Sequence, residues 1–435
     1  MNTFEISGGE KLEGEIVPQG AKNECLQILC AVLLTDELIT IKNIPDIIDV
    51  NVLINLLKNL GVKIVKKSDG CYSFKADKIN LDFLMSNDYI KESKKIRGSI
   101  MMIGPILSRF GSAVIPKPGG DKIGRRSLDT HFDSLSELGG VIKYDNKKSF
   151  YFIEASNLKG KKIILNEPSV TGTANLVMAS VLASGKTIIY NAACEPYIQK
   201  LCLMLNSMGE DIKGIKSNLL IIQGVKKLKG TEHTISPDFV EIGSWIGLAA
   251  MTKSKLVIKN VDFESLNQII NFYKKMGINT EKRGNDLLIP AHENGYKISD
   301  NIDGSILTIS DGPWPGLTPD ILSIILVVAT QAEGSLLIHQ KMFESRLFFV
   351  DKLIDMGAKI ILCDPHRATV IGLNFKSKLK ASTLVSPDIR AGISLLIAAL
   401  SAKGKSYINN VQQIDRGYQN IVKRLQMIGA KIKRV

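Results

Sequence analysis

The chain has 435 residues, of which 45% are hydrophobic and 23% charged, a composition typical of soluble globular proteins and a length sufficient for two domains with large cores. Its net charge of +13 comes without the RNP-type signature or basic–aromatic alternation of nucleic-acid-binding proteins, so a small polyanionic ligand is favoured over nucleic acid. The N-terminus reads as strand and turn with no apolar signal core, and the most apolar stretch, residues 321–332, is too short to span a bilayer.

In chain order, one module recurs six times. Each copy starts with an apolar segment rich in small residues, continues through a short β-branched run, and has an amphipathic segment that ends at a glycine before another β-run. A period this long indicates a small folding unit that stacks on its neighbours. All-round apolarity predicts that the first helix of each copy is buried, at residues 26–34, 99–107, 174–183, 245–251, 321–330 and 392–400. The closing glycines are Gly61, Gly139, Gly209, Gly277, Gly357 and Gly429.

The second helices of the modules, such as residues 52–60 and 420–427, are amphipathic and are expected on the outside. Three modules make a domain of roughly 200 residues, so six modules predict two domains with a ligand-binding cleft between them. The strand-like N-terminus is expected to complete the sheet of the second domain, with chain crossings near Gly20 and residues 236–238. The predicted domains are residues 22–236, and residues 1–21 together with 237–435.

Basic residues stand at the predicted helix starts, where the helix dipole disfavours a cation by a few tenths to about 1 kcal/mol. A multiply charged anion would resolve this conflict, because it gains both the helix N–H groups and the side-chain cations. Each cation alone is more often a surface or ion-pair residue, but their recurrence at matching positions favours a site for phosphate and carboxylate groups. The cations are Lys22, Arg97 and Arg390 at first helices and Arg126, Arg346 and Arg416 at second helices. A role as a helix cap stays open for Ser169, Asp320, Asp388 and Asp415.

Residues 118–126 form a turn with three glycines that lacks the GxxxxGK[ST] pattern of a nucleotide P-loop. This segment is either a plain connector or a mobile lid that carries charged groups over the cleft. The six cysteines are irregularly spaced and form no CxxC pair, which predicts reduced thiols in a cytoplasmic protein. Cys363 and His366 are close in sequence, but no second pair lies near them, and a metal site is not predicted.

Five motifs, in this order, carry a family resemblance that runs from about Phe4 to Ile432. The chain resembles the UDP-N-acetylglucosamine 1-carboxyvinyltransferase family of enolpyruvyl transferases. The resemblance implies an α/β fold of two inside-out α/β barrels, each built from three of the six repeated modules. The motifs are Gly20-Ala21-Lys22-Asn23, the Pro-Gly-Gly loop ending in Gly124-Arg125-Arg126, Phe343-Glu344-Ser345-Arg346, Pro387-Asp388-Ile389-Arg390-Ala391 and Ile414-Asp415-Arg416-Gly417-Tyr418.

The resemblance also implies roles for individual residues. Lys22, Arg126 and Arg416 are similar to residues that hold the phosphate of phosphoenolpyruvate, and Arg346 and Arg390 to those that grip its carboxylate. Asp320 resembles the base near the sugar 3′-hydroxyl, and Arg97 and Asp388 resemble supporting residues of the cleft. Residues similar to those that bind the UDP-sugar are Asn23, Asp129, Ser169, Val170, Thr171 and Asp320.

By this resemblance the protein is a cytoplasmic transferase that moves enolpyruvate from phosphoenolpyruvate to UDP-N-acetylglucosamine, the first committed step of peptidoglycan precursor synthesis, without a metal or other cofactor. Many family members have Cys where this chain has Asp121, which implies insensitivity to fosfomycin and makes Asp121 a candidate proton donor. The chain also has Ile321-Leu322 where a Gln-containing pattern is common. Two alternatives are the shikimate-pathway synthase, whose signature has Ser-Lys-Ser where this chain has Ala21-Lys22-Asn23, and a non-catalytic binding protein.

Overall fold

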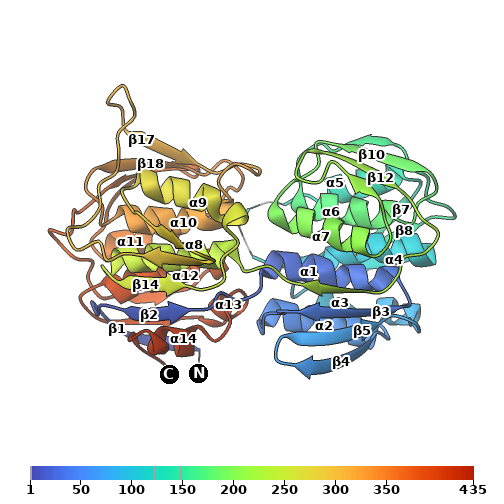
Figure 1. The fold of residues 1–435 in the computed structure, drawn as a ribbon, viewed down its shortest axis with the longest axis horizontal. Helices are drawn as coiled ribbons and strands as arrows, with labels where there is room; N and C mark the ends of the chain where they lie inside the picture. Colours follow the sequence, from blue (N-terminus) through green and yellow to red (C-terminus); the bar gives the residue numbers. More distant parts are fainter. Residues whose placement is uncertain (1, 122, 125, 147–148) are drawn as a thin grey trace. The chain divides into compact units, whose positions relative to one another are not determined.

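The computed structural model describes the whole chain except residues 1, 122, 125, 147 and 148 (Figure 1). Lys122 and Arg125, which belong to the Pro-Gly-Gly loop, therefore lie outside the described residues. The chain divides into two compact units. The N-terminal unit comprises residues 20–121 and 126–236, and the C-terminal unit comprises residues 2–19, 123–124 and 237–435.

The N-terminal unit contains three copies of the module. Its first helices are α1 (Lys22–Ala31), α4 (Ile103–Phe110) and α6 (Val170–Ser180), and its second helices are α2 (Ile48–Asn59), α5 (Asp129–Glu137) and α7 (Pro196–Ser207). Shorter helical segments are η1 (Val32–Leu34), η2 (Leu81–Met85), α3 (Asn87–Ser93) and η3 (Arg97–Met102). The strands are β3 (Leu38–Lys42), β4 (Lys63–Ser68), β5 (Cys71–Lys75), β6 (Ser112–Pro116), β7 (Val141–Asp145), β8 (Phe150–Glu154), β9 (Lys162–Ile164), β10 (Lys186–Tyr190), β11 (Ile212–Lys213), β12 (Leu219–Gln223) and β13 (Thr231–Thr234).

The C-terminal unit contains the other three copies. Its first helices are α8 (Phe239–Met251), α10 (Pro319–Ala329) and α12 (Ile389–Ser401), and its other helices are α9 (Phe263–Lys275), α11 (Val350–Asp355), α13 (Gln412–Asp415) and α14 (Ile421–Met427). The strands are β1 (Thr3–Gly8), β2 (Glu13–Ile16), β14 (Lys255–Ile258), β15 (Glu281–Arg283), β16 (Asp286–Ile289), β17 (Leu307–Ser310), β18 (Ser335–His339), β19 (Lys359–Asp364), β20 (Arg367–Ile371), β21 (Thr383–Val385), β22 (Gly404–Asn409) and β23 (Lys431–Arg434).

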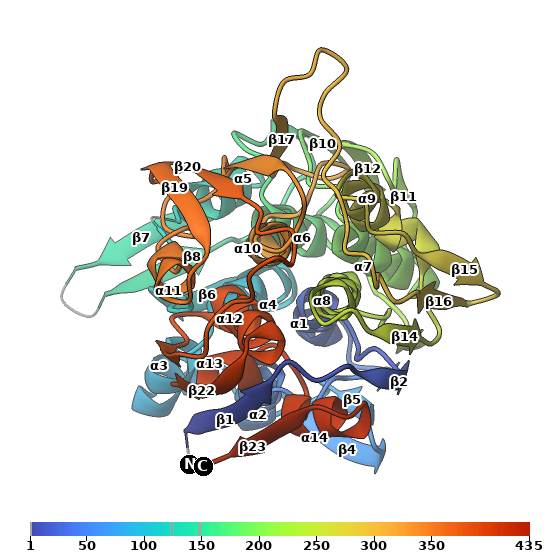
Figure 2. The same ribbon diagram turned by 90° about the vertical axis from the view of Figure 1, so that its left-hand side faces the viewer.

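The predicted burial of the first helices is confirmed. Every residue of α8 and of α12 is buried, and these two helices pack on each other and on α10. Figure 2 shows the three helices inside the C-terminal unit with the strands around them. Their Ala, Gly, Ile and Leu side chains present apolar surface in all directions, so burial on every side stabilises them. No helix in the described part of the chain is long and apolar enough to cross a membrane.

The sheets repeat the module more fully than the sequence suggested. Among the described residues, five sheets have four strands each, in which one parallel pair is followed by antiparallel neighbours, for example β13-β3-β5-β4 and β17-β18-β20-β19. The sixth described sheet, β6-β8-β7, has three strands, and no parallel pair is found among its described residues. Each module therefore closes with a hairpin or an added strand rather than with the single strand predicted.

The closing glycines follow the second helices, as predicted. All six have positive φ, from +79° at Gly277 to +108° at Gly139. A residue just beyond a helix end commonly adopts this left-handed conformation, which costs a side chain about 1 kcal/mol and glycine almost nothing. The recurring Leu-Gly and Met-Gly signals are thus helix stop signals set by backbone geometry.

Apart from the short segment that contains residues 123–124, which is assigned to the C-terminal unit, the chain passes from one unit to the other at Gln19–Gly20 and at Ser236–Pro237. Buried glutamates in the first turns of α1 and α8 anchor these two segments: Glu24 accepts the N–H of Ser236 at 3.2 Å, and Glu241 accepts the N–H of Gln19 at 2.8 Å. Upstream of the first crossing, β1 lies between β22 and β23, and β2 pairs in parallel with β14. The first strands of the chain therefore complete sheets of the C-terminal unit.

Candidate active site

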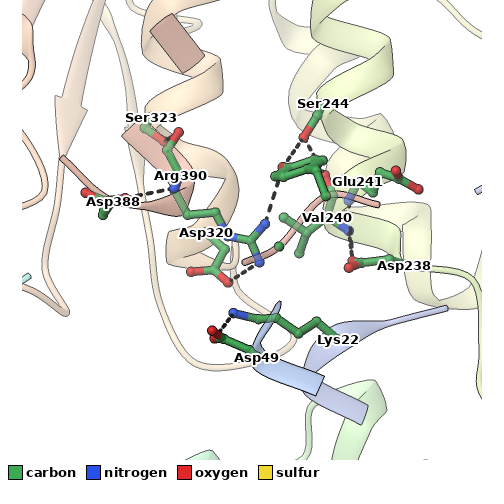
Figure 3. A network of polar contacts seen from close by, with 12 residues as sticks. Lys22, Asp49, Asp238, Val240, Glu241, Ser244, Asp320, Ser323, Asp388 and Arg390 are labelled. Carbon is green, nitrogen blue, oxygen red and sulfur yellow. Dashed lines mark hydrogen bonds and ion pairs between the residues drawn. The ribbon is translucent and has the colours of Figure 1, made fainter. Parts of the chain in front are cut away.

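In the C-terminal unit, one carboxylate joins two of the predicted cations. Asp320 Oδ1 lies 2.6 Å from Arg346 Nη2, and its Oδ2 lies 2.9 Å from Arg390 Nη2 (Figure 3 shows the pair with Arg390). The side chains of Arg346 and Arg390 are only 8% and 5% exposed, whereas that of Asp320 is 18% exposed. The two guanidinium groups are thus held inside the unit with one internal carboxylate between them, an arrangement that suits recognition of a carboxylate.

Further hydrogen bonds fix the position of Arg390. Its Nη1 donates to the Tyr418 hydroxyl at 3.3 Å, and this hydroxyl lies 2.8 Å from Ser244 Oγ on α8. The Asp388 carboxylate accepts the backbone N–H groups of Arg390 and Ala391, at 2.8 and 3.0 Å. Asp388 is therefore the N-cap of α12, and the alternative of a helix cap is confirmed for this residue.

Of the other three candidate caps, one is a helix cap and two are not. Ser169 caps α6 by accepting the N–H of Gly172 at 3.2 Å. Asp320 is not a cap, because Thr318 occupies the N-cap position of α10 and Asp320 lies inside the helix. Asp415 instead pairs with Arg434 at 2.6 Å near the surface. The capping role that could explain Asp320 without any ligand is therefore wrong.

Arg346 lies in the turn between β18 and α11. Asp311, which is buried, fixes the start of this segment by accepting the N–H of Lys341 at 2.5 Å. Burial raises the pKa of the Asp311 carboxyl above its ordinary value. The guanidinium of Arg346 lies 5.0 Å from the Phe343 ring, and its buried Nε has no hydrogen-bond partner among the described residues. A buried N–H group without an acceptor is costly, so a ligand oxygen that accepts its hydrogen would be bound more tightly.

One predicted placement is wrong. Arg416 does not start a helix: it follows the end of α13 and donates from Nη1 to Gln413 Oε1 at 3.0 Å, whereas α14 starts only at Ile421. At a helix C-terminus the dipole favours a cation, so the argument from electrostatic conflict does not apply to Arg416. Arg126, in contrast, lies just before the start of α5 at Asp129, as predicted.

In the N-terminal unit, Lys22 is the first residue of α1. Its Nζ lies 3.5 Å from Asp49 Oδ2 on α2, and the side chains are only 11% and 6% exposed (Figure 3). No side chain caps the start of α1. The sequence did not point to Asp49, which is the internal counter-ion of Lys22. Asn23, the next predicted contact, is the second residue of the same helix and is half-buried.

The Pro-Gly-Gly loop meets the start of η3. Arg97 Nη2 donates to the backbone oxygens of Arg126 and Ser127, at 3.1 Å each, and Arg126 Nη2 donates to the backbone oxygen of Asp121 at 3.0 Å. Burial, together with the positive charge of Arg126, lowers the pKa of Arg97 to about 10. Two cations held this close in a mostly buried setting would be stabilised by an anionic ligand.

Four of the six predicted contacts to the sugar nucleotide lie at the starts of α5 and α6, which pack on each other. Ser169 is the cap of α6, and Val170 and Thr171 are its first residues. Asp129 is the first residue of α5, and its backbone N–H donates to Ser127 Oγ at 3.0 Å. Among the described residues, no three His, Cys, Asp or Glu side chains are grouped so that they could hold a metal ion.

Comparison with known proteins points in one direction. Residues 6–425 match the family model of EPSP synthase (3-phosphoshikimate 1-carboxyvinyltransferase). The chain is 61% identical over 435 residues to UDP-N-acetylglucosamine 1-carboxyvinyltransferase of Bacteroides thetaiotaomicron, with 100% of each chain covered. Enzymes of the same name are 58% identical in Porphyromonas gingivalis (100% of each chain) and 45% identical in Treponema pallidum (99% of each).

Two solved structures share the fold. The enolpyruvyl transferase NikO from Streptomyces tendae matches with a TM-score of 0.85 over 99% of this chain and 98% of its own, at 19% identity. EPSP synthase from Acinetobacter baumannii matches with a TM-score of 0.76 over 100% and 99%, at 17% identity. These likenesses confirm the predicted fold class. The described strands form separate sheets of three or four strands, and none of these sheets closes on itself.

Proposed function

The chain belongs to the family of UDP-N-acetylglucosamine 1-carboxyvinyltransferases, and we propose that it transfers the enolpyruvyl group of phosphoenolpyruvate to the 3′-hydroxyl of UDP-N-acetylglucosamine. The observation that carries this proposal is the 61% identity over the full length of a relative with that activity in its name. The reaction would begin peptidoglycan precursor synthesis. We place it in the cytoplasm because both proposed substrates are cytoplasmic metabolites.

The chemistry requires an addition and an elimination. In the addition, the acceptor hydroxyl loses its proton and its oxygen bonds to C2 of phosphoenolpyruvate while C3 gains a proton, which gives a tetrahedral phospho-ketal. In the elimination, C3 loses a proton and the bond from C2 to the phosphate oxygen breaks, which releases phosphate and the enolpyruvyl ether. We assign the base to Asp320 and the acid at C3 to Asp121. Lys22, Arg126 and Arg416 are the proposed partners of the phosphate.

Arg346 and Arg390 are the proposed partners of the phosphoenolpyruvate carboxylate. Their contacts with the Asp320 carboxylate, at 2.6 and 2.9 Å, support this assignment, because they show that the pair can hold such a group. The substrate carboxylate would compete with Asp320 for the same donors. Its binding would free the Asp320 oxygens to accept the proton of the acceptor hydroxyl. Binding of the donor substrate would thus prepare the base.

Phosphate release tests the proposal. The purified protein should release phosphate from phosphoenolpyruvate when UDP-N-acetylglucosamine is present and not when shikimate 3-phosphate replaces it. Release with shikimate 3-phosphate alone would assign the chain to the shikimate-pathway reaction. Absence of release with either acceptor, from a protein that still binds the sugar nucleotide, would support the non-catalytic alternative.

A further inference from the structure

A network of hydrogen bonds joins Asn175 and Thr171 on α6 to His131 on α5. Asn175 on α6 is fully buried, and its side-chain amide makes hydrogen bonds to two backbone groups. Its Oδ1 accepts the N–H of Gly104 at 2.9 Å, and its Nδ2 donates to the backbone oxygen of Ile100 at 2.8 Å. A backbone N–H can only donate and a carbonyl oxygen can only accept, so the orientation of this amide is fixed.

The fixed amide determines the tautomer of a buried histidine. His131 on α5 is 1% exposed, and its Nδ1 lies 2.8 Å from Asn175 Nδ2. The amide nitrogen has a second hydrogen to donate, so Nδ1 must accept and therefore carries no proton. The ring proton is then on Nε2, which lies 3.1 Å from Thr171 Oγ1. His131 is thus the donor in its contact with Thr171.

Because His131 is the donor, the hydroxyl hydrogen of Thr171 is not used within the network. Thr171 Oγ1 accepts from His131, so the hydrogen of its own hydroxyl is free to donate. Within the described part of the chain, the Thr171 side chain has no hydrogen bond other than the one from His131. Thr171 is half-buried in the first turn of α6, whereas His131 and Asn175 are buried.

We propose that His131 is a positioning residue that sets the Thr171 hydroxyl as a hydrogen-bond donor to an acceptor oxygen of the sugar nucleotide. This inference rests on the proposed function, in which the start of α6 contacts that substrate. A phosphate oxygen of the diphosphate suits the contact, because it can only accept. Burial and the nearby charge of Arg97 lower the pKa of His131 to about 3, so the ring stays neutral at physiological pH.

The competing explanation is a purely structural tie between α5 and α6. Such a tie already exists next to the network, where Thr130 Oγ1 donates to Glu167 Oε1 at 3.2 Å. Thr130→Val is therefore a matched control, because it removes a hydroxyl between the same segments and leaves the His131–Thr171 contact intact. It should leave the KM values of both substrates within about twofold of those of the wild type.

Nuclear magnetic resonance tests the tautomer without any substrate. The chain has five histidines, so ¹⁵N-histidine labelling gives few signals, and His131→Gln identifies the one in question. We expect the His131 ring to be protonated at Nε2 only, with no titration between pH 5 and pH 8. A proton on Nδ1, or a ring that titrates in this range, overturns the inference whatever the enzyme does.

Kinetics test the consequence for the substrate. Thr171→Val should raise the KM for UDP-N-acetylglucosamine about tenfold or more, as expected for a hydrogen bond to a charged group, and change the KM for phosphoenolpyruvate little. Thr171→Ser should restore the wild-type value. His131→Phe should act like Thr171→Val and add nothing in the double variant, whereas His131→Gln keeps an amide donor near Nε2 and should be milder.

The outcomes separate this inference from the function on which it rests. An active Thr171→Val variant with unchanged KM, or additive effects in the double variant, would overturn the role of His131 and leave the transferase activity standing. A wild-type protein that releases no phosphate would overturn the proposed function and with it the sugar nucleotide as the acceptor of this hydrogen bond.

Discussion

At the scale of single residues, the Asp320 carboxylate has two roles that compete with each other. It neutralises Arg346 and Arg390 in the ligand-free protein, at 2.6 and 2.9 Å, and the proposed mechanism needs it as a proton acceptor. Replacing it should therefore affect both stability and rate, but to different extents. Replacement removes an internal counter-ion from two mostly buried guanidinium groups, a loss that an added anion can compensate.

We predict that Asp320→Asn lowers kcat by roughly a hundredfold to ten-thousandfold, the range typical of a lost general base. Asparagine keeps the size of the side chain and cannot take the proton. Steady-state kinetics and calorimetric titration with UDP-N-acetylglucosamine would separate rate from binding. Asp415→Asn, which removes the exposed ion pair with Arg434, is the control and should be nearly neutral. Retention of kcat within a few-fold in Asp320→Asn would contradict the role as base.

A second residue-scale prediction concerns Asp121. A carboxylate attacks an epoxide far more slowly than a thiolate does, so the wild-type protein should resist fosfomycin. Asp121→Cys should remain active and lose activity progressively with fosfomycin. Peptide mass spectrometry should place the adduct at position 121, because the exposed Cys363 is an alternative target in both proteins. Covalent modification of Asp121 in the wild type would refute the argument.

The sequence predicted individual site residues better than their contacts. Arg346 and Arg390 were identified from motifs and Asp320 from its place at a helix start and from the family resemblance, yet their ion pairs join positions that are far apart in the chain. The same limit hid Asp49 and His131, since a buried counter-ion or histidine has no local signal in one sequence. Tyr418 belonged to a quoted motif, but only the fold reveals that its hydroxyl contacts Arg390.

At the scale of elements, helix ends were easier to predict than helix starts. The six closing glycines marked the ends because positive φ there is a local property of the backbone. Helix starts depend on which side chain reaches a free N–H group, and Asp388 and Ser169 do so whereas Asp320 does not. The prediction that Arg416 lies at a helix start was wrong, because Arg416 follows the short helix α13 and a turn separates it from α14.

Two of the closing glycines give an element-scale prediction. Gly277 and Gly357 both have positive φ, but a Cβ at Gly277 would lie 2.5 Å from the backbone oxygen of Lys297, whereas a Cβ at Gly357 meets nothing within 4 Å. Gly357→Ala should cost about 1 kcal/mol of unfolding free energy from the left-handed conformation alone. Gly277→Ala should cost clearly more, because backbone must move. Chemical denaturation would measure both, and equal losses would contradict the steric argument.

At the scale of the whole molecule, sequence order and spatial assembly differ. The first strand, β1, is the inner strand between β22 and β23, so residues from both ends of the chain form one sheet. The strand-like N-terminus suggested this assignment, but the register, with Phe4 opposite Ile408 and Arg434, could not be derived without coordinates. Pairing between residues so distant in sequence depends on the complete fold of the C-terminal unit.

This topology predicts which unit a substitution in the first strand will destabilise. Phe4 is fully buried in β1, so Phe4→Ala should cost about 3–5 kcal/mol through the lost packing and the cavity it leaves. Hydrogen exchange followed by mass spectrometry should then show faster exchange across residues 239–435 and little change across residues 22–236. The matched control is Phe74→Ala in β5, equally buried but in the N-terminal unit, which should give the opposite pattern. If Phe4→Ala instead loosened residues 22–236, the assignment of the first strand to the C-terminal unit would be wrong.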